Sequence, residues 1–92
     1  MSVQQNIENL LKTQLNPSHI EVINESASHA GHAHGATDSH FRVVVISEFF
    51  EGLRQVARHK KIYAILAELM DNPIHALAIN SYSTNEWLDK QA

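Results

Sequence analysis

The chain has 92 residues, a length that supports one hydrophobic core and therefore one domain spanning residues 1–92. Its composition, 43% hydrophobic and 18% charged, is that of a soluble globular protein and is far from that of a disordered chain. The formal charge of −3 gives the molecule as a whole no attraction for nucleic acid, so nucleic-acid binding would require a local basic surface.

The sequence contains no cysteine, which excludes disulfides, zinc–thiolate sites, cysteine nucleophiles and any cluster held by the chain's own thiolates. The longest apolar run, Val43 to Ile46, is far too short to cross a bilayer. The amino-terminal residues lack the basic start and the long apolar stretch of a signal peptide. We therefore expect a cytoplasmic protein without membrane contact.

The first predicted element is an amphipathic helix over Val3 to Leu15. Its apolar residues recur in steps of three and four, which puts them on one face, and Pro17 ends it. These residues are Val3, Ile7, Leu10, Leu11 and Leu15. A strand follows from His19 to Ser26, because Ile20 and Val22 alternate with polar residues.

Residues 27–39 are small and polar, contain two glycines and show no periodicity, which is typical of a flexible loop. The next segment, Phe41 to Ile46, is apolar on both of its alternating faces. It is therefore predicted to be a central strand that is covered on both sides.

A long helix is predicted from Leu53 to Met70, ended by Asn72-Pro73. At 100° per residue one broad arc is mostly apolar. It comprises Val56, His59, Ile62, Tyr63, Leu66, Leu69 and Met70.

A third strand is predicted from His75 to Tyr82. Ser83 and Glu86 have the spacing of a capping box, which indicates a short last helix that contains Trp87. The expected order of elements is therefore α-β-β-α-β-α.

The second strand, the long helix and the third strand have the size of a right-handed parallel β-α-β unit. If these strands are parallel neighbours, His40 and His75 begin them at the same end of the sheet. The histidine-rich loop also delivers the chain to that end.

Histidine is unusually frequent, with seven residues, five of them between His19 and His40. Neutral imidazole is a good ligand for borderline metals, and the loop presents His29, His32 and His34. Ligands and solvated polar side chains remain alternatives for this loop. A backbone hydrogen bond at the strand end is the simpler interpretation of His75, and a hydrogen-bonded core position is that of His59.

Four basic residues lie on the predicted long helix. Arg54, Arg58 and Lys61 form one stripe, with Lys60 nearby, and such a stripe could contact phosphates or simply be a solvated face. No Gly-x-x-Gly loop is present to favour nucleic acid further.

Several segments together resemble the BolA family in order and spacing over nearly the whole chain. They are Asn24-Glu25-Ser26-x-x-His29, Asp38-Ser39-His40-Phe41-Arg42-Val43, Ser47-x-x-Phe50-x-Gly52, Arg58-His59-x-x-Ile62-Tyr63, Ile74-His75-Ala76-Leu77-Ala78-Ile79 and Glu86-Trp87. Each segment alone is a weak signal, but the set is highly specific.

The resemblance implies an α/β fold akin to class II KH domains, with a three-stranded mixed sheet and helices packed on it. It implies a CGFS-type monothiol glutaredoxin as partner, and a [2Fe–2S] cluster held jointly by the glutaredoxin cysteine, glutathione and residues of this chain. The family's ligands carry over to His75 and, in the loop, to His29. The loop here is slightly longer than in the common pattern and adds His32 and His34 as alternates to His29.

The resemblance also implies a transcriptional regulator that contacts DNA through Arg54, Arg58, Lys60 and Lys61. We expect no enzymatic activity, because no nucleophile elbow or phosphate loop surrounds the hydrolase-type residues Asp38, His40 and Ser47. The sequence leaves open whether apo chains form a homodimer.

Overall fold

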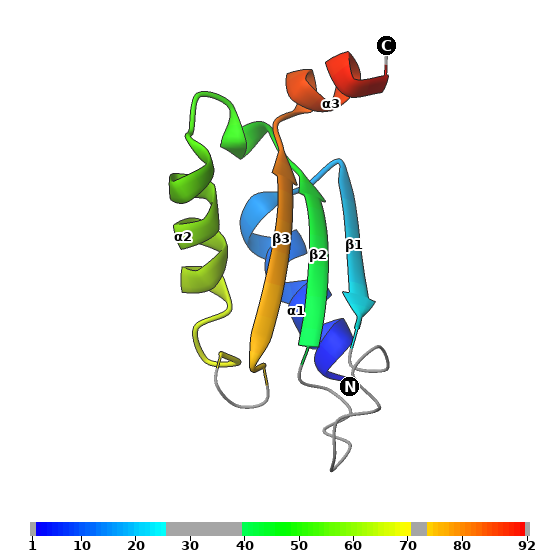
Figure 1. Ribbon diagram of the computed structural model, residues 1–92, viewed down its shortest axis with the longest axis vertical. Coiled ribbons are helices and arrows are strands. Elements are labelled where there is room, and N and C mark those ends of the chain that lie inside the picture. The colour runs from blue at the N-terminus through cyan, green and yellow to red at the C-terminus, as the bar shows by residue number, and fades with distance from the viewer. Residues whose placement is uncertain (1, 26–39, 71–73, 92) are drawn as a thin grey trace.

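The computed structural model describes residues 2–25, 40–70 and 74–91. Its elements follow the order α-β-β-α-β-α (Figure 1). They are α1 (Val3–Leu15), β1 (His19–Asn24), β2 (His40–Ile46), α2 (Gln55–Ile65), β3 (Ala76–Tyr82) and α3 (Thr84–Gln91), with a 3-10 turn at Glu48–Phe50. The predicted order of elements is confirmed.

Helix α1 is delimited by local sequence signals. At its start the Gln5 amide donates to Ser2 Oγ over 3.1 Å and the Ser2 amide donates to Gln5 Oε1 over 3.2 Å, which forms a capping box. At its end Asn16 adopts a left-handed conformation with φ 42° and its amide donates to the Lys12 carbonyl. The predicted bounds of this helix are confirmed.

The sheet has the order β1-β2-β3, so β2 is the central strand. β1 pairs with β2 in the antiparallel direction, and β2 pairs with β3 in the parallel direction, with His40 opposite Ala76 and Ile46 opposite Tyr82. The predicted parallel β-α-β unit is therefore confirmed, with α2 as its crossover helix.

One face of the sheet carries the core. Phe41, Val43 and Val45 of β2 lie in a single buried cluster with residues from both long helices. α1 contributes Ile7, Leu11 and Leu15, and α2 contributes Ile62 and Leu66. Because both helices share this cluster, they cover the same face of the sheet (Figure 1).

The prediction that β2 is covered on both sides holds at one end only. On the outer face Arg42 and Val44 are half-buried, whereas Ile46 is 1% exposed. Ile46 lies in register between His19 and Tyr82, and the Trp87 ring of α3 contacts both of those rings, with centroid distances of 6.3 and 5.3 Å. α3 therefore covers the outer face only at the end where β2 finishes.

The predicted end of the long helix is wrong, and its predicted buried face is confirmed only in part. Ile62 and Leu66 of the predicted arc are buried, and Leu69 and Met70 pack against the core. α2 begins at Gln55 rather than Leu53, and it ends at Ile65, because the turn after Leu66 returns the chain so that Ile74 enters the core. Val56, expected on the buried arc, is 65% exposed, while the expected surface residue Arg58 is 3% exposed.

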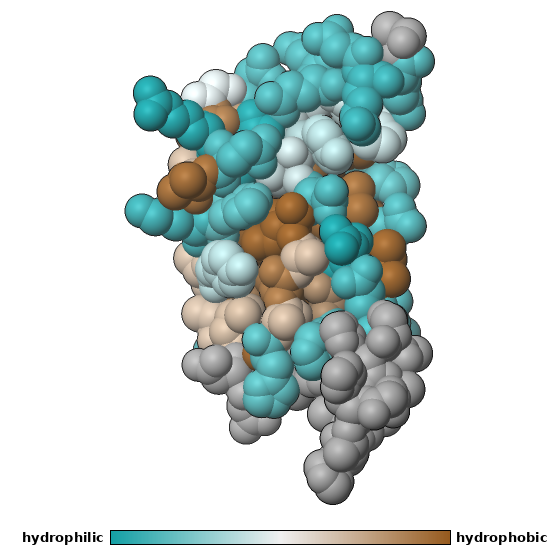
Figure 2. All heavy atoms as spheres, viewed as in Figure 1, coloured by the Kyte–Doolittle hydropathy of each residue, from teal (hydrophilic) through white to brown (hydrophobic). Residues whose placement is uncertain are grey.

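Helix α3 has no buried residue, and Figure 2 shows mostly hydrophilic surface where it lies. Polar contacts hold its start instead. The Ser83 amide donates to Glu86 Oε1 over 2.8 Å and the Glu86 amide donates to Ser83 Oγ over 3.2 Å, which confirms the predicted capping box. The Arg58 guanidinium donates to both Glu86 oxygens, over 2.6 and 3.1 Å. These hydrogen bonds, first that of Arg58 and then that of the Ser83 amide, lower the pKa of Glu86 from 4.5 to about 2.

We expect the Glu86 carboxylate to stabilise the fold above pH 4.5, and this stabilisation to be lost as the pH falls from 4.5 to about 2. The sign follows because the folded-state pKa lies below the ordinary value, so the unfolded chain binds the proton first. In Glu86→Gln, which keeps a side chain able to form the capping box, the difference in unfolding free energy from wild type should therefore shrink over this interval. Urea denaturation at a series of pH values measures it, and a difference independent of pH contradicts the assignment.

Candidate functional site

The parallel pairing brings two of the singled-out histidines to one end of the sheet. His40 begins β2 opposite Ala76, and His75 is the residue that precedes Ala76. The Glu25 amide, just after β1, donates to the His40 carbonyl over 2.8 Å. The end of β1 and the starts of β2 and β3 therefore meet at one end (Figure 1), which we call the histidine end.

The two histidines differ in accessibility. The His75 side chain is exposed, just outside the last strand pair, whereas His40 is half-buried and already engaged in interactions. The predicted loop ligand His29 and its alternates His32 and His34 lie outside the described residues. Of the predicted ligands the structure thus describes only His75.

Among residues 2–25, 40–70 and 74–91 there is no group of three or more histidine, aspartate or glutamate side chains that could hold a metal ion. An exposed imidazole at the end of a sheet can nevertheless supply one ligand to a metal that another molecule presents. Since the chain has no cysteine, thiolate ligands would have to come from that other molecule.

The predicted basic stripe is only partly on the surface. Arg54, Lys60 and Lys61 are exposed, as a contact with phosphates requires. Arg58 is not, because it is turned toward the junction of β3 and α3. Besides Glu86, its guanidinium donates to the Leu53 carbonyl over 2.9 Å and to the Ser81 carbonyl over 3.4 Å.

Arg58 therefore links parts of the fold and is unavailable as a surface contact. Its guanidinium also lies 5.8 Å from the centre of the buried Phe50 ring. The available signal in the sequence was its spacing of four residues from the buried Ile62, which places both side chains on one helical face. The core position expected for His59 is not observed, because this residue is only half-buried.

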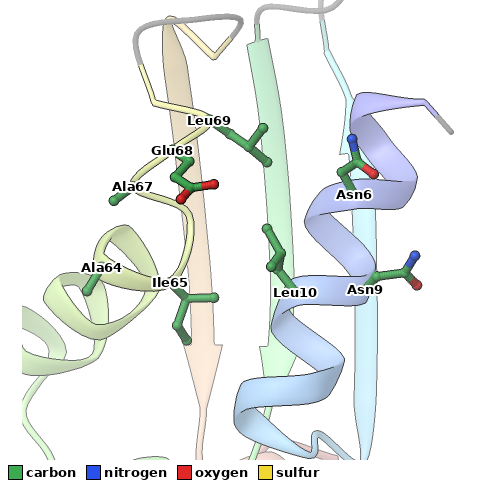
Figure 3. Close-up of a pocket in the computed structure, with 8 residues that line it drawn as sticks. All are labelled: Asn6, Asn9, Leu10, Ala64, Ile65, Ala67, Glu68 and Leu69. Carbon is green, nitrogen blue, oxygen red and sulfur yellow. The ribbon is translucent and has the colours of Figure 1, made fainter.

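A groove of about 600 Å³ lies between α1 and the end of α2 with the turn that follows (Figure 3). Leu10, Ile65 and Leu69 line its apolar part, and Asn6, Asn9 and Glu68 form polar parts of its wall. No sequence pattern indicated it, since it forms from the packing of two separate helices.

Within the described part of the chain, no helix has the length and apolar character needed to cross a membrane.

The observed order of elements, the mixed three-stranded sheet and the two long helices on one face define a small α/β domain with an exposed histidine beside a parallel strand start. The sequence profile of the family described as "BolA-like protein" matches residues 11–86. This chain belongs to the BolA family.

The chain is 46% identical over 85 residues to the "DNA-binding transcriptional regulator BolA" of Vibrio cholerae, an alignment that covers 92% of this chain and 78% of that protein. It is 40% identical to "BolA-like protein 1" of Bos taurus, over 92% of this chain and 62% of that protein. Among solved structures, BolA1 from Arabidopsis thaliana superposes with a TM-score of 0.85 at 32% identity, over 94% of this chain and 96% of that one. These likenesses confirm the predicted family and fold.

We expect Arg58→Met to lower the free energy of unfolding by about 2 kcal/mol, because it removes the hydrogen bonds that join α2 to β3 and α3 while keeping an apolar stem of similar length. Urea denaturation measures this loss. The exposed neighbour Lys61→Met is the matched control and should change stability by less than about 0.5 kcal/mol. Equal effects of the two substitutions contradict the role assigned to Arg58.

Proposed function

We propose that this BolA-family protein is an adaptor that binds a CGFS-type monothiol glutaredoxin and supplies histidine ligands to a shared [2Fe–2S] cluster. The cluster is cargo, and the adaptor acts in its transfer or in iron or redox regulation. The exposure of His75 at the histidine end is the observation that carries the proposal. A half-buried His40 with its own interactions is a poorer donor to an incoming partner.

The donor set is compatible with such sharing. Histidine replaces cysteine on one iron of Rieske-type clusters, so imidazole is an adequate ligand for a [2Fe–2S] unit. The absence of cysteine from the sequence requires the thiolates to come from the glutaredoxin and from glutathione. His29 is the proposed second ligand of this chain, with His32 and His34 as alternates.

We expect His75→Ala to abolish the heterocomplex spectrum after anaerobic reconstitution with a monothiol glutaredoxin and glutathione, because one iron loses its ligand. Visible absorption and circular dichroism measure it, against the spectrum of the glutaredoxin alone. His29→Ala, His32→Ala and His34→Ala rank the loop histidines in the same assay.

The matched control is His19→Ala. His19 is also exposed, but it pairs with Ile46 at the opposite end of the sheet. Its removal should leave the cluster spectrum unchanged. A spectrum that is indifferent to this protein, or to His75→Ala, ends the adaptor proposal.

A DNA-binding regulator is the second candidate function. Two observations favour it: relatives carry the name "DNA-binding transcriptional regulator BolA", and three basic side chains are exposed on or beside α2. These are Arg54, Lys60 and Lys61, and the burial of Arg58 removes it from the proposed contact surface.

We expect duplex DNA binding to weaken in Lys60→Ala, Lys61→Ala and Arg54→Ala, since each removes a cation that can neutralise a phosphate. The slope of log K against log salt should fall by about one for each phosphate that the variant no longer neutralises. Lys12→Ala, on α1 and paired with Glu8, is the control. Binding that does not depend on salt excludes this candidate.

A further inference from the structure

Arg42 links all three strands on the outer face of the sheet. Its Nε donates to Glu25 Oε2 over 2.9 Å, and its Nη1 donates to Asn80 Oδ1 over 2.9 Å. Glu25 follows β1 directly, Arg42 belongs to β2, and Asn80 belongs to β3. One guanidinium therefore joins the two edge strands across the central one.

The pairing register gives this link its direction. Arg42 is opposite Ile23 on one side and Ala78 on the other. Glu25 lies two residues beyond Ile23 toward the histidine end, and Asn80 lies two residues beyond Ala78 in the opposite direction. The guanidinium thus crosses the sheet diagonally, a geometry that resists both separation and sliding of the strands.

Glu25 connects this link to the histidine end. Glu25 and His40 are the described residues on either side of residues 26–39, and the Glu25 amide donates to the His40 carbonyl over 2.8 Å. The Glu25 carboxylate accepts from Arg42, so Glu25 is tied to β2 through its backbone and through its side chain. Removing the Arg42 guanidinium takes away the side-chain tie, and the backbone pair should then open more often.

We propose that Arg42 is a positioning residue: through Glu25, at the histidine end of β1, and Asn80, farther along β3, it holds the three strands in the arrangement that brings the histidine end together. This inference rests on the proposed adaptor function. Ligands from separate segments of the chain bind one cluster together only if the segments are held close to each other, which keeps their effective concentration high. Arg42 touches neither the cluster nor the partner and acts through the strand ends.

The experiment compares Arg42→Gln and Glu25→Gln with Glu21→Gln. Glu21 is the matched control, because it is a glutamate of β1 that lies nearer the other end of the sheet, opposite Val44. Neither Arg42 nor Glu25 is in the core, so all three variants should fold, and circular dichroism in the far ultraviolet checks this.

The first readout uses the apo protein. Hydrogen exchange of the Glu25 amide should become roughly three- to tenfold faster in Arg42→Gln, the range expected for losing a partly exposed ion pair with its hydrogen bonds. The Ser47 amide, which donates to the Tyr82 carbonyl at the opposite end of the sheet, is the internal reference and should not change.

The second readout is the visible circular dichroism and lifetime of the reconstituted heterocomplex with glutaredoxin and glutathione. Arg42→Gln and Glu25→Gln should alter the spectrum and shorten the cluster's lifetime roughly three- to tenfold, because the strand ends open more often in these variants. Glu21→Gln should match wild type. Arg42→Lys, which keeps the charge but lacks the guanidinium fork, should restore the lifetime in part.

The outcomes separate the two proposals. An altered spectrum in Arg42→Gln and Glu25→Gln, with Glu21→Gln unchanged, supports the positioning role. A wild-type spectrum and lifetime in Arg42→Gln overturns it and leaves the adaptor proposal intact. If wild-type protein forms no heterocomplex, the adaptor proposal fails and the positioning role fails with it.

Discussion

The parallel pairing of β2 with β3 is the constraint on which the arrangement of this protein depends. Parallel strands cannot be joined by a tight turn, so the chain must cross over from the end of β2 to the start of β3, and α2 makes that crossover. The crossover places α2 beside α1 on one face, where both helices complete a single core. It also brings the starts of both strands together, so His40 and His75 share one end of the sheet.

The two ends of the sheet are stabilised by different means. At the end where β2 finishes, the Trp87 ring contacts the His19 and Tyr82 rings on either side of Ile46, and the buried Arg58 joins α2 to the start of α3. At the histidine end no helix contributes to the outer face in the described part of the chain, and Arg42 holds the strands through polar contacts. His75, at this end, is exposed, as binding to a partner requires.

The proposed adaptor role gives each molecule a distinct part. In this proposal the chain would offer the imidazole of His75, and the glutaredoxin and glutathione would supply sulfur, because this sequence has no cysteine. An imidazole binds a metal in its neutral form, so ligation through histidine would depend on pH. The exposed cations of α2 lie on a separate element, so the two candidate functions use different residues.

The sequence alone determined the elements whose signals are local. The helix from Val3 to Leu15 could be predicted to the residue because its apolar residues recur at helical spacing and Pro17 ends it. The capping box of Ser83 and Glu86 was readable for the same reason, and the order of elements and the family followed from periodicity and motif spacing. The meeting of His40 and His75 could be predicted on the condition that the two strands are parallel neighbours, and the structure supplies that pairing.

Only the tertiary structure decided that Arg58 belongs to the buried face of α2 and that Val56 does not. Helical periodicity grouped Val56 with Ile62, whereas the packing buries Arg58 and leaves Val56 in solvent. A sequence pattern predicts a charged side chain to be exposed, because burying it is costly unless other groups accept hydrogen bonds from its donors. Those partners, Leu53, Ser81 and Glu86, come from segments that meet only in the folded chain. The link from Arg42 to Glu25 and Asn80 was hidden for the same reason, because it depends on the register of three strands.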